Sequence, residues 1–142
     1  WGATLRLTAT AAVLGGLVFF LVPDLLVGVF GAEPAVAALG RTLLLMAAVM
    51  GLVDAITIVS HCTITGAGDT RFALVATVGC AWFVNLPLAL AFVAVLEWGA
   101  PGAWLALLVE VVALGTLTTW RVLSGRAFER AEVRRVAQLA AA

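Results

Sequence analysis

Four long apolar stretches, joined by short links that contain glycine, proline and acidic residues, constrain what this chain can fold into. They run over about residues 4–29, with an interruption at Pro23-Asp24, and over about 36–65, 71–96 and 102–121. A helix rises about 1.5 Å per residue and the hydrocarbon core of a bilayer is about 30 Å thick, so roughly 20 apolar residues cross it. Short links place consecutive helices antiparallel. The sequence therefore predicts an all-α integral membrane protein with a four-transmembrane-helix bundle.

The composition excludes several other classes of protein. Of the 142 residues, 64% are apolar and 11% are charged, whereas about 25% of the residues in soluble domains are charged. A soluble chain this short buries only roughly 60–70% of its surface, too little to hide so many apolar side chains. Disordered chains are poor in apolar residues, and nucleic-acid-binding domains carry a basic excess, whereas the net charge here is zero. We therefore expect the lipid bilayer, and no nucleic acid, as a partner.

Arginine is concentrated on one side of the predicted bundle. Four spans place both ends of the segment on the same side of the membrane, together with the link between the second and third spans. The side that holds both ends of the segment carries Arg6, Arg71, Arg121, Arg126, Arg130, Arg134 and Arg135. The opposite side carries Arg41. Because basic residues accumulate on the cytoplasmic side, both termini are expected in the cytoplasm of a multi-pass protein of the plasma (bacterial inner) membrane. Residues 126–142 are then a cytoplasmic basic tail after a transmembrane region at 1–125.

Polar residues lie near the middle of three predicted spans, where such side chains are costly and usually functional. They are Asp54 in the second span, Asn85 in the third and Glu110 in the fourth. On the second span, an arc of about 80° at helical spacing also holds Asp54, Thr57, His61 and Thr65. Such a face must turn toward other helices or a water-filled cavity, so candidate cavity-lining residues are Thr57, His61, Asn85 and Glu110. The alternative is that these groups only form hydrogen bonds between helices.

The link at residues 66–71 reads Gly-Ala-Gly-Asp-Thr-Arg and predicts a tight turn. Gly66 and Gly68 permit the chain to reverse, and Asp69 is expected to cap the helix that follows. The chain has a single histidine, no arrangement of nucleophile and base, and no GK[ST] sequence after the turn. We therefore predict no catalytic residues, no enzymatic activity and no cofactor.

Five short segments of the chain match, in their order along the sequence, motifs of a known protein family. They are Pro23-Asp24 with Val29-Phe30-Gly31-Ala32-Glu33, the GAGDTR turn, Asn85-Leu86-Pro87-Leu88, Gly99-Ala100-Pro101-Gly102-Ala103-Trp104 and Leu123-Ser124-Gly125-Arg126. In this order they resemble the second lobe of the multidrug and toxic compound extrusion (MATE) family. Many sodium-coupled bacterial members also carry an intramembrane Asp fifteen positions before the Asp of the turn, as Asp54 precedes Asp69. The chain departs from the family pattern at Thr65, usually Arg, and at Ala127, usually Trp.

This resemblance implies a fold and a function. Family members resemble two six-helix lobes in one chain, so this segment would be the last four helices of the second lobe of a twelve-helix transporter, without its N-terminal helices. The implied function is cation-coupled antiport, with H⁺ or Na⁺ as the coupling ion, that exports organic and often cationic drugs and xenobiotics. Asp54 is then the ion-coupling residue, because a carboxylate in a bilayer relieves its desolvation cost by taking a proton or by coordinating Na⁺. No other metal site is expected.

Two alternatives remain open. A lipid-linked oligosaccharide or polysaccharide flippase of the same superfamily would share the lobe architecture, but would be expected to present Arg or Lys to its cavity to hold pyrophosphate. A non-transporting membrane scaffold would be expected to pair Asp54 with an arginine across an interface. No basic residue lies in the middle of a predicted span, which favours the export of neutral or cationic substrates.

Overall fold

The computed structural model describes residues 2–29 and 33–128, and every regular element in these residues is a helix. The segments long and apolar enough to cross a membrane are Gly2–Leu21, Pro34–Gly66, Thr70–Val95 and Gly99–Leu123. The prediction of an all-α, four-transmembrane-helix bundle is therefore confirmed. Residues 129–142, which contain most of the predicted basic tail, lie outside the described residues.

The third span is a composite helix, unlike the other three. The elements are α1 (Gly2–Leu21), α2 (Pro23–Gly28), α3 (Pro34–Gly66), α4 (Thr70–Cys80), η1 (Ala81–Asn85), α5 (Leu86–Leu90), η2 (Ala91–Val95) and α6 (Gly99–Leu123). Of these, α4, η1, α5 and η2 follow one another without a break and together make the third span. Both η1 and η2 are π-helical turns.

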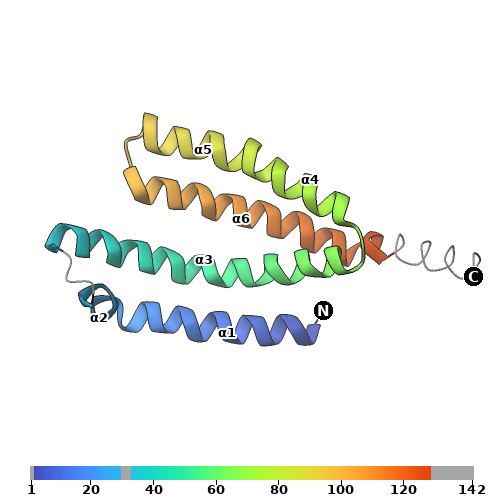
Figure 1. Cartoon of the computed structure of the whole chain (residues 1–142), viewed down its shortest axis with the longest axis horizontal. Helices are drawn as coiled ribbons and strands as arrows, with labels where there is room; N and C mark the ends of the chain where they lie inside the picture. The colour runs from blue at the N-terminus through green and yellow to red at the C-terminus, as the bar shows by residue number, and fades with distance from the viewer. Residues whose placement is uncertain (1, 30–32, 129–142) are drawn as a thin grey trace, which may run out of the picture.

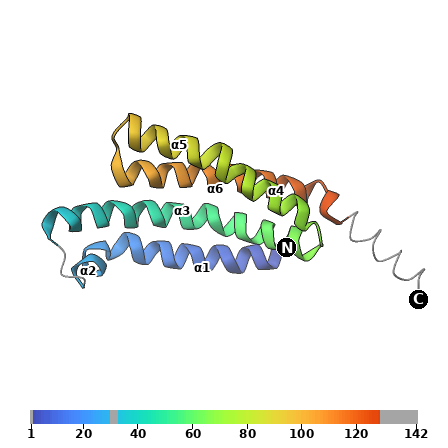
Figure 2. The same ribbon diagram turned by 45° about the horizontal axis from the view of Figure 1, so that its top comes forward.

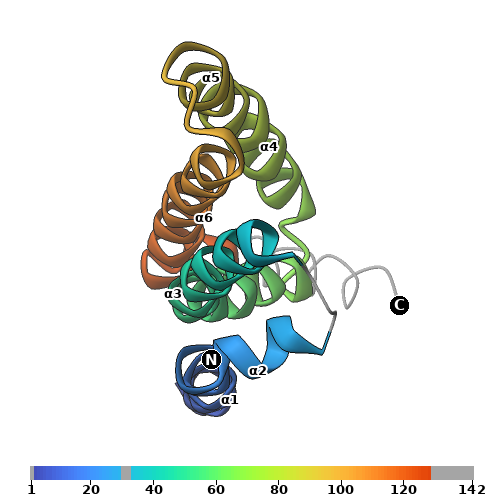
Figure 3. The same cartoon turned by 90° about the vertical axis from the view of Figure 1, so that its left-hand side faces the viewer.

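Helix α3 lies at the centre of the bundle. It packs against α1 on one side and α6 on the other, and the third span packs on α6 (Figures 1 and 2). Helices α3 and α6 run in the same direction, whereas α1 and the third span run in the opposite direction. The third span approaches α3 through α4, whereas α5 lies beside α6 and away from α3 (Figure 3). We call the end with residues 67–69 the turn end and the opposite end the α2 end.

Proline sets the boundaries near the α2 end. The first span was expected to reach residue 29, but α1 ends at Leu21 and the separate helix α2 begins at Pro23. Because Pro23 has no N–H to continue the hydrogen bonds of α1, it begins a new helix instead, as Pro34 does for α3. Val27 of α2 then rests on Gly40 of α3, where an added Cβ would come within 3.3 Å of it. The link at residues 30–32 lies outside the described residues.

Small residues permit the closest contacts between helices. Gly16 of α1 lies against Ala48 of α3, and an added Cβ would come within 3.4 Å of the Ala48 carbonyl oxygen. Gly115 of α6 lies against Thr57 of α3, where an added Cβ would collide with Thr57 Oγ1. Within a membrane, close packing and interhelical hydrogen bonds hold helices together, since lipid is as apolar as the side chains. The contact between Gly115 and Thr57 therefore fixes α3 against α6 near mid-span.

The best-buried part of the bundle is at the turn end. Ile64 of α3, Ala73 of α4, Val122 of α6 and Ala127 form an apolar cluster there. Helix α1, by contrast, has no buried residue, and large apolar side chains are exposed along all four spans. Apolar surfaces of this extent are stable in contact with lipid or with further helices, but not in contact with water. The cluster joins α3, α4 and α6 at the turn end.

Candidate functional site

Asp54 lies within α3, 20 residues after Pro34 and 12 before Gly66. This position is well inside a hydrocarbon core of about 30 Å. The residue is half-buried, and no other described residue forms a hydrogen bond or an ion pair with its carboxylate. A carboxylate at this depth is costly to keep ionised.

Thr57, one turn after Asp54, connects α3 to α6. Its Oγ1 lies 3.2 Å from the carbonyl oxygen of Val53 on its own helix and 3.2 Å from that of Val111 on α6. Thr57 also lines a groove of about 440 Å³ between α3 and α6, together with Gly115 of α6. The hydroxyl thus serves helix packing, while the residue borders a groove that Asp54 itself does not line.

Asn85 and Glu110, which come from different spans, meet in the structure. Asn85 Nδ2 donates a hydrogen bond to Glu110 Oε2 at 2.8 Å. Asn85 is the last residue of η1, and Glu110 lies at the middle of α6. Both side chains are half-buried. The contact links the third span to α6 at the depth where the sequence placed both residues.

The polar face of α3 is divided between two neighbours. Ser60 Oγ lies 3.0 Å from Thr119 Oγ1 of α6, whereas His61 Nε2 lies 3.3 Å from Thr77 Oγ1 of α4. Sequence reasoning missed Ser60, Thr77 and Thr119. Their hydroxyl groups were a weak signal, because a hydroxyl within a helix also bonds to its own backbone, as Thr116 does with the carbonyl oxygen four residues earlier.

The turn at residues 67–69 depends on one of its two glycines. Gly68 has φ +82°, a left-handed conformation that favours glycine. Gly66 is the last residue of α3, and its φ is not positive. A Cβ added to Gly66 would meet no atom within 4 Å. Only Gly68 therefore has the conformational role that was expected of both.

The prediction that the Asp69 side chain caps the third span is wrong. Asp69 occupies the position before α4, but its side chain makes no capping hydrogen bond. Its Oδ2 instead accepts hydrogen bonds from Arg121 Nη2 at 2.7 Å and from Nε at 3.0 Å. The side chains are 0% exposed for Asp69 and 12% for Arg121, and the guanidinium lies 4.8 Å from the ring centroid of Phe72. A charged donor outcompetes a backbone amide for a buried carboxylate, so the residue joins α4 to α6.

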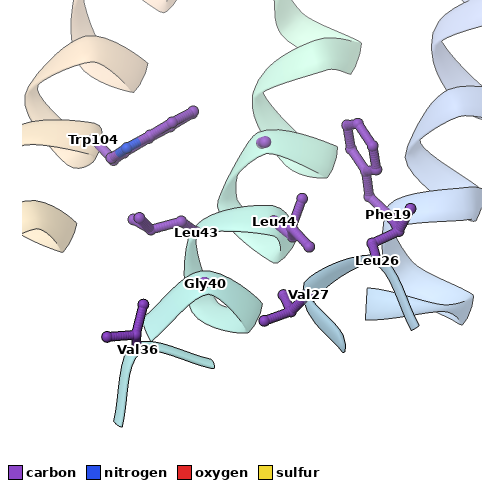
Figure 4. Close-up of a pocket in the computed structure, with 9 residues that line it drawn as sticks. Phe19, Leu26, Val27, Val36, Gly40, Leu43, Leu44 and Trp104 are labelled. Carbon is purple, nitrogen blue, oxygen red and sulfur yellow. The ribbon is translucent and has the colours of Figure 1, made fainter. Parts of the chain in front are cut away.

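An apolar pocket of about 510 Å³ opens near the α2 end (Figure 4). In the close-up, Trp104 of α6 extends toward α3, and Phe19 of α1 stands on the other side of the same helix. The lining residues are Phe19, Leu26, Val27, Val36, Gly40, Leu43, Leu44, Ala47 and Trp104. This lining includes none of the polar candidates, so the pocket offers shape and apolar surface but no charge.

A model of the MatE family matches residues 2–91, which is more than half of the chain. The chain belongs to the MatE family. Several similar proteins are named probable multidrug resistance protein NorM. The one from Xylella fastidiosa (strain 9a5c) is 32% identical over 117 residues, which cover 81% of this chain and 25% of the relative. The one from Xanthomonas axonopodis pv. citri (strain 306) is 34% identical over 114 residues, or 80% of this chain and 23% of the relative.

The match confirms the family that the motifs indicated. The matched residues of the MatE family model include Asp54, the turn at 66–71 and Asn85, and end before Glu110. The chain spans about a quarter of the length of the curated relatives that it matches. No solved structure matches it significantly.

Proposed function

We propose that this chain forms part of a cation-coupled efflux transporter, in which Asp54 exchanges H⁺ or Na⁺ for an organic cation. The observation that carries the proposal is the contrast among three carboxylates of the bundle. Asp69 is paired with Arg121 and Glu110 accepts a hydrogen bond from Asn85, whereas Asp54 has no partner among the described residues. A mid-span carboxylate in this state is a ready acceptor for a mobile cation.

The physical basis of coupling is the cost of the charge. Translocon-derived scales assign about 2.5–3.5 kcal/mol to an aspartate at the centre of a membrane helix. A bound proton or Na⁺ removes that cost, and so does a cationic substrate, so the two compete for Asp54. A ligand that neutralises the carboxylate better in one conformation shifts the population toward it. Exchange of one cation for the other across the membrane follows.

Several polar residues are proposed to take part in the path with Asp54. Thr57 lines the groove between α3 and α6. His61 contacts Thr77 of α4, and Asn85 of η1 contacts Glu110 of α6, so these residues are proposed to act on the side of the bundle that faces the third span. The relatives are named multidrug resistance proteins, which supports small organic substrates. Because the chain spans about a quarter of these relatives, the rest of the path belongs to other helices of the intact protein.

The distribution of arginine supports an orientation. Arg6, Arg71, Arg121 and Arg126 lie toward the turn end, whereas Arg41 lies toward the α2 end. By the positive-inside rule, we propose that the turn end faces the cytoplasm of a bacterial inner membrane. The α2 end then faces outward.

The test is Asp54→Asn in the intact transporter, with efflux of a fluorescent organic cation from inside-loaded cells or vesicles as the measurement. The variant is expected to insert normally and to lose efflux driven by a proton or Na⁺ gradient, because an amide cannot exchange its charge. Asp24→Asn is the matched control. Asp24 is exposed at the α2 end, and its ion pair among the described residues is an exposed 3.7 Å contact with Arg41, which is worth about 0–1 kcal/mol. Undiminished efflux in Asp54→Asn would contradict the proposal.

The two alternatives predict other arrangements. A flippase that holds pyrophosphate needs an available basic group, but Arg121, the least exposed of the described arginines, is engaged by Asp69. A scaffold was expected to pair Asp54 with an arginine, and no such pair occurs among the described residues. Neither alternative is favoured by an observation of its own.

A further inference from the structure

A second carboxylate lies at mid-depth in the bundle, on a different helix from Asp54. Glu110 is 11 residues after Gly99 and 13 before Leu123, the two ends of α6. Roughly 16–20 Å of helix therefore separates it from either end. Its contact with the third span is the 2.8 Å hydrogen bond that its Oε2 accepts from Asn85 Nδ2. Any role for Glu110 must account for a carboxylate at the most costly depth.

The backbone of the third span is distorted at the point that brings Asn85 to Glu110. π-Helical turns make up well under 1% of protein residues and are frequent at functional sites. Asn85 is the last residue of such a turn, η1. In an unbroken α-helix the buried position at Cys80 would continue at Val84, four residues later; in a π turn the fifth residue, Asn85, takes that place. Pro87, which has no N–H for the regular pattern, favours the irregular turn.

The contact between Glu110 and Asn85 differs from the other interhelical contacts because it contains a carboxylate without a positively charged partner among the described residues. Asp69 is neutralised by the guanidinium of Arg121, whereas the described partner of Glu110 is an uncharged amide. Where α3 and α6 need only a polar contact, two neutral hydroxyls, Ser60 and Thr119, provide it. A carboxylate is therefore not required for joining helices, and its negative charge has no counter-ion among the described residues.

The titratable groups around Glu110 supply no positive charge to it. On α4, the buried thiol of Cys80 is close enough to interact electrostatically with Glu110 of α6. Neither α5 nor η2 contains a titratable residue. On α3, Asp54 is one turn before Thr57, whose hydroxyl contacts the α6 backbone beside Glu110. His61, one turn further along α3, is hydrogen-bonded toward α4. The described neighbours of Glu110 therefore provide no counter-ion for its carboxylate.

We propose that Glu110 and Asn85 form a second proton-binding site of the transporter, separate from Asp54. A primary amide matches a protonated carboxyl group, because its N–H donates to one carboxyl oxygen while its carbonyl oxygen accepts from the carboxyl O–H. A proton needs only one carboxylate oxygen, and the Glu110–Asn85 pair provides it together with the matching amide. Uptake and release of the proton leave the Asn85 hydrogen bond in place.

The site adds a proton to the exchange. Glu110 takes up a proton from one side as –COO⁻ becomes –COOH, and releases it to the other side when the bundle changes its facing. This step rests on the proposed function, since a proton site contributes to transport only if the protein exchanges cations. The number of protons exchanged per substrate is then larger than Asp54 alone provides.

The experiment is infrared difference spectroscopy of the purified intact transporter while the pH is changed, which detects the carbonyl stretch of protonated carboxyl groups without requiring transport. Glu110→Gln is expected to remove one titrating carboxyl signal, and that signal is expected to persist in Asp54→Asn. Glu97→Gln, at an exposed residue in the link before α6, is the matched control. The carboxyl signal that Glu110→Gln removes is expected to persist in this control. If every titrating signal of the wild type persists in Glu110→Gln, the proposal is overturned.

The roles of Asp54 and Glu110 are tested by different readouts. Efflux that survives in Asp54→Asn overturns the role of Asp54, but leaves the proton site standing if the Glu110 signal is present. Should Glu110→Gln fail to fold, Asn85→Ala keeps the carboxyl group and removes its partner. The carbonyl signal is then expected to shift in frequency, because its hydrogen bond is lost, and an unshifted spectrum would overturn the proposal.

Discussion

Replacing Arg121 with Gln is expected to lower the free energy of unfolding by about 3–5 kcal/mol, the usual cost of breaking a buried ion pair by removing one partner. The reason is the environment of Asp69, whose side chain is 0% exposed and whose Oδ2 accepts two hydrogen bonds from this guanidinium. Without Arg121, this buried carboxylate loses a charged donor and the two hydrogen bonds that it supplies. The variant also loses the cation–π contact with Phe72. Reversible unfolding in mixed detergent micelles measures the change.

The two partners are not equivalent, which sharpens the test. Arg121 is 12% exposed near the end of α6, so after Asp69→Asn its long side chain can move its charge toward the interface. Asp69→Asn is therefore expected to cost less than Arg121→Gln, and the double variant less than the sum. Arg126→Gln is the control, since Arg126 is exposed and stacks on Trp120 at 5.2 Å, a contact worth about 0.5–1 kcal/mol. Equal losses in Arg121→Gln and Arg126→Gln would contradict this account of the ion pair.

Loss of the same ion pair is expected to affect folding more than transport. Asp69→Ala is expected to lower the yield of folded protein more than it changes ion selectivity, because the pair holds α4 against α6 at the turn end, away from Asp54. The measurement compares the yield of membrane-inserted protein with efflux per molecule in H⁺ and in Na⁺ gradients. A change in selectivity at normal yield would show that the turn takes part in coupling.

Hydropathy and length were sufficient to predict the four spans. A membrane helix must satisfy its own backbone hydrogen bonds and present apolar side chains to lipid, so its location is encoded locally in the sequence. The depth of Asp54, Asn85 and Glu110 followed from counting residues along these spans. The one clear difference in extent, the end of α1 at Leu21, also has a local cause, since Pro23 interrupts the backbone hydrogen bonds.

The partners of the polar groups could not be predicted in the same way. Asp69 was assigned to a local cap because Asp is common at that position, whereas its partner Arg121 is 52 residues away in the sequence. Asn85 faces Glu110 from the end of the π-helical turn η1, and regular helical spacing gives no sign of such a turn. Such pairings depend on how spans cross, and four apolar spans can cross in many ways without changing their hydropathy.

Gly115→Ala is expected to destabilise the bundle by about 1–3 kcal/mol, the typical cost of overpacking a close contact. An added Cβ would collide with Thr57 Oγ1, so the Thr57 side chain must rotate or α3 and α6 must move apart. Either change weakens the contact of Thr57 Oγ1 with the Val111 carbonyl. Unfolding in mixed micelles measures the stability, and efflux per folded molecule reports the effect on the neighbouring Asp54.

A matched glycine separates this steric effect from helix propensity. Gly51 lies within α3, and an added Cβ there would meet no atom within 4 Å. Gly51→Ala is therefore expected to be neutral or to stabilise the helix by roughly 0.5–1 kcal/mol. Thr57→Ala removes the colliding hydroxyl, so Gly115→Ala should cost less in that background than in the wild type. If the two costs are equal, the Thr57–Gly115 contact does not set the distance between α3 and α6, and the helix that carries Asp54 is held by its other contacts.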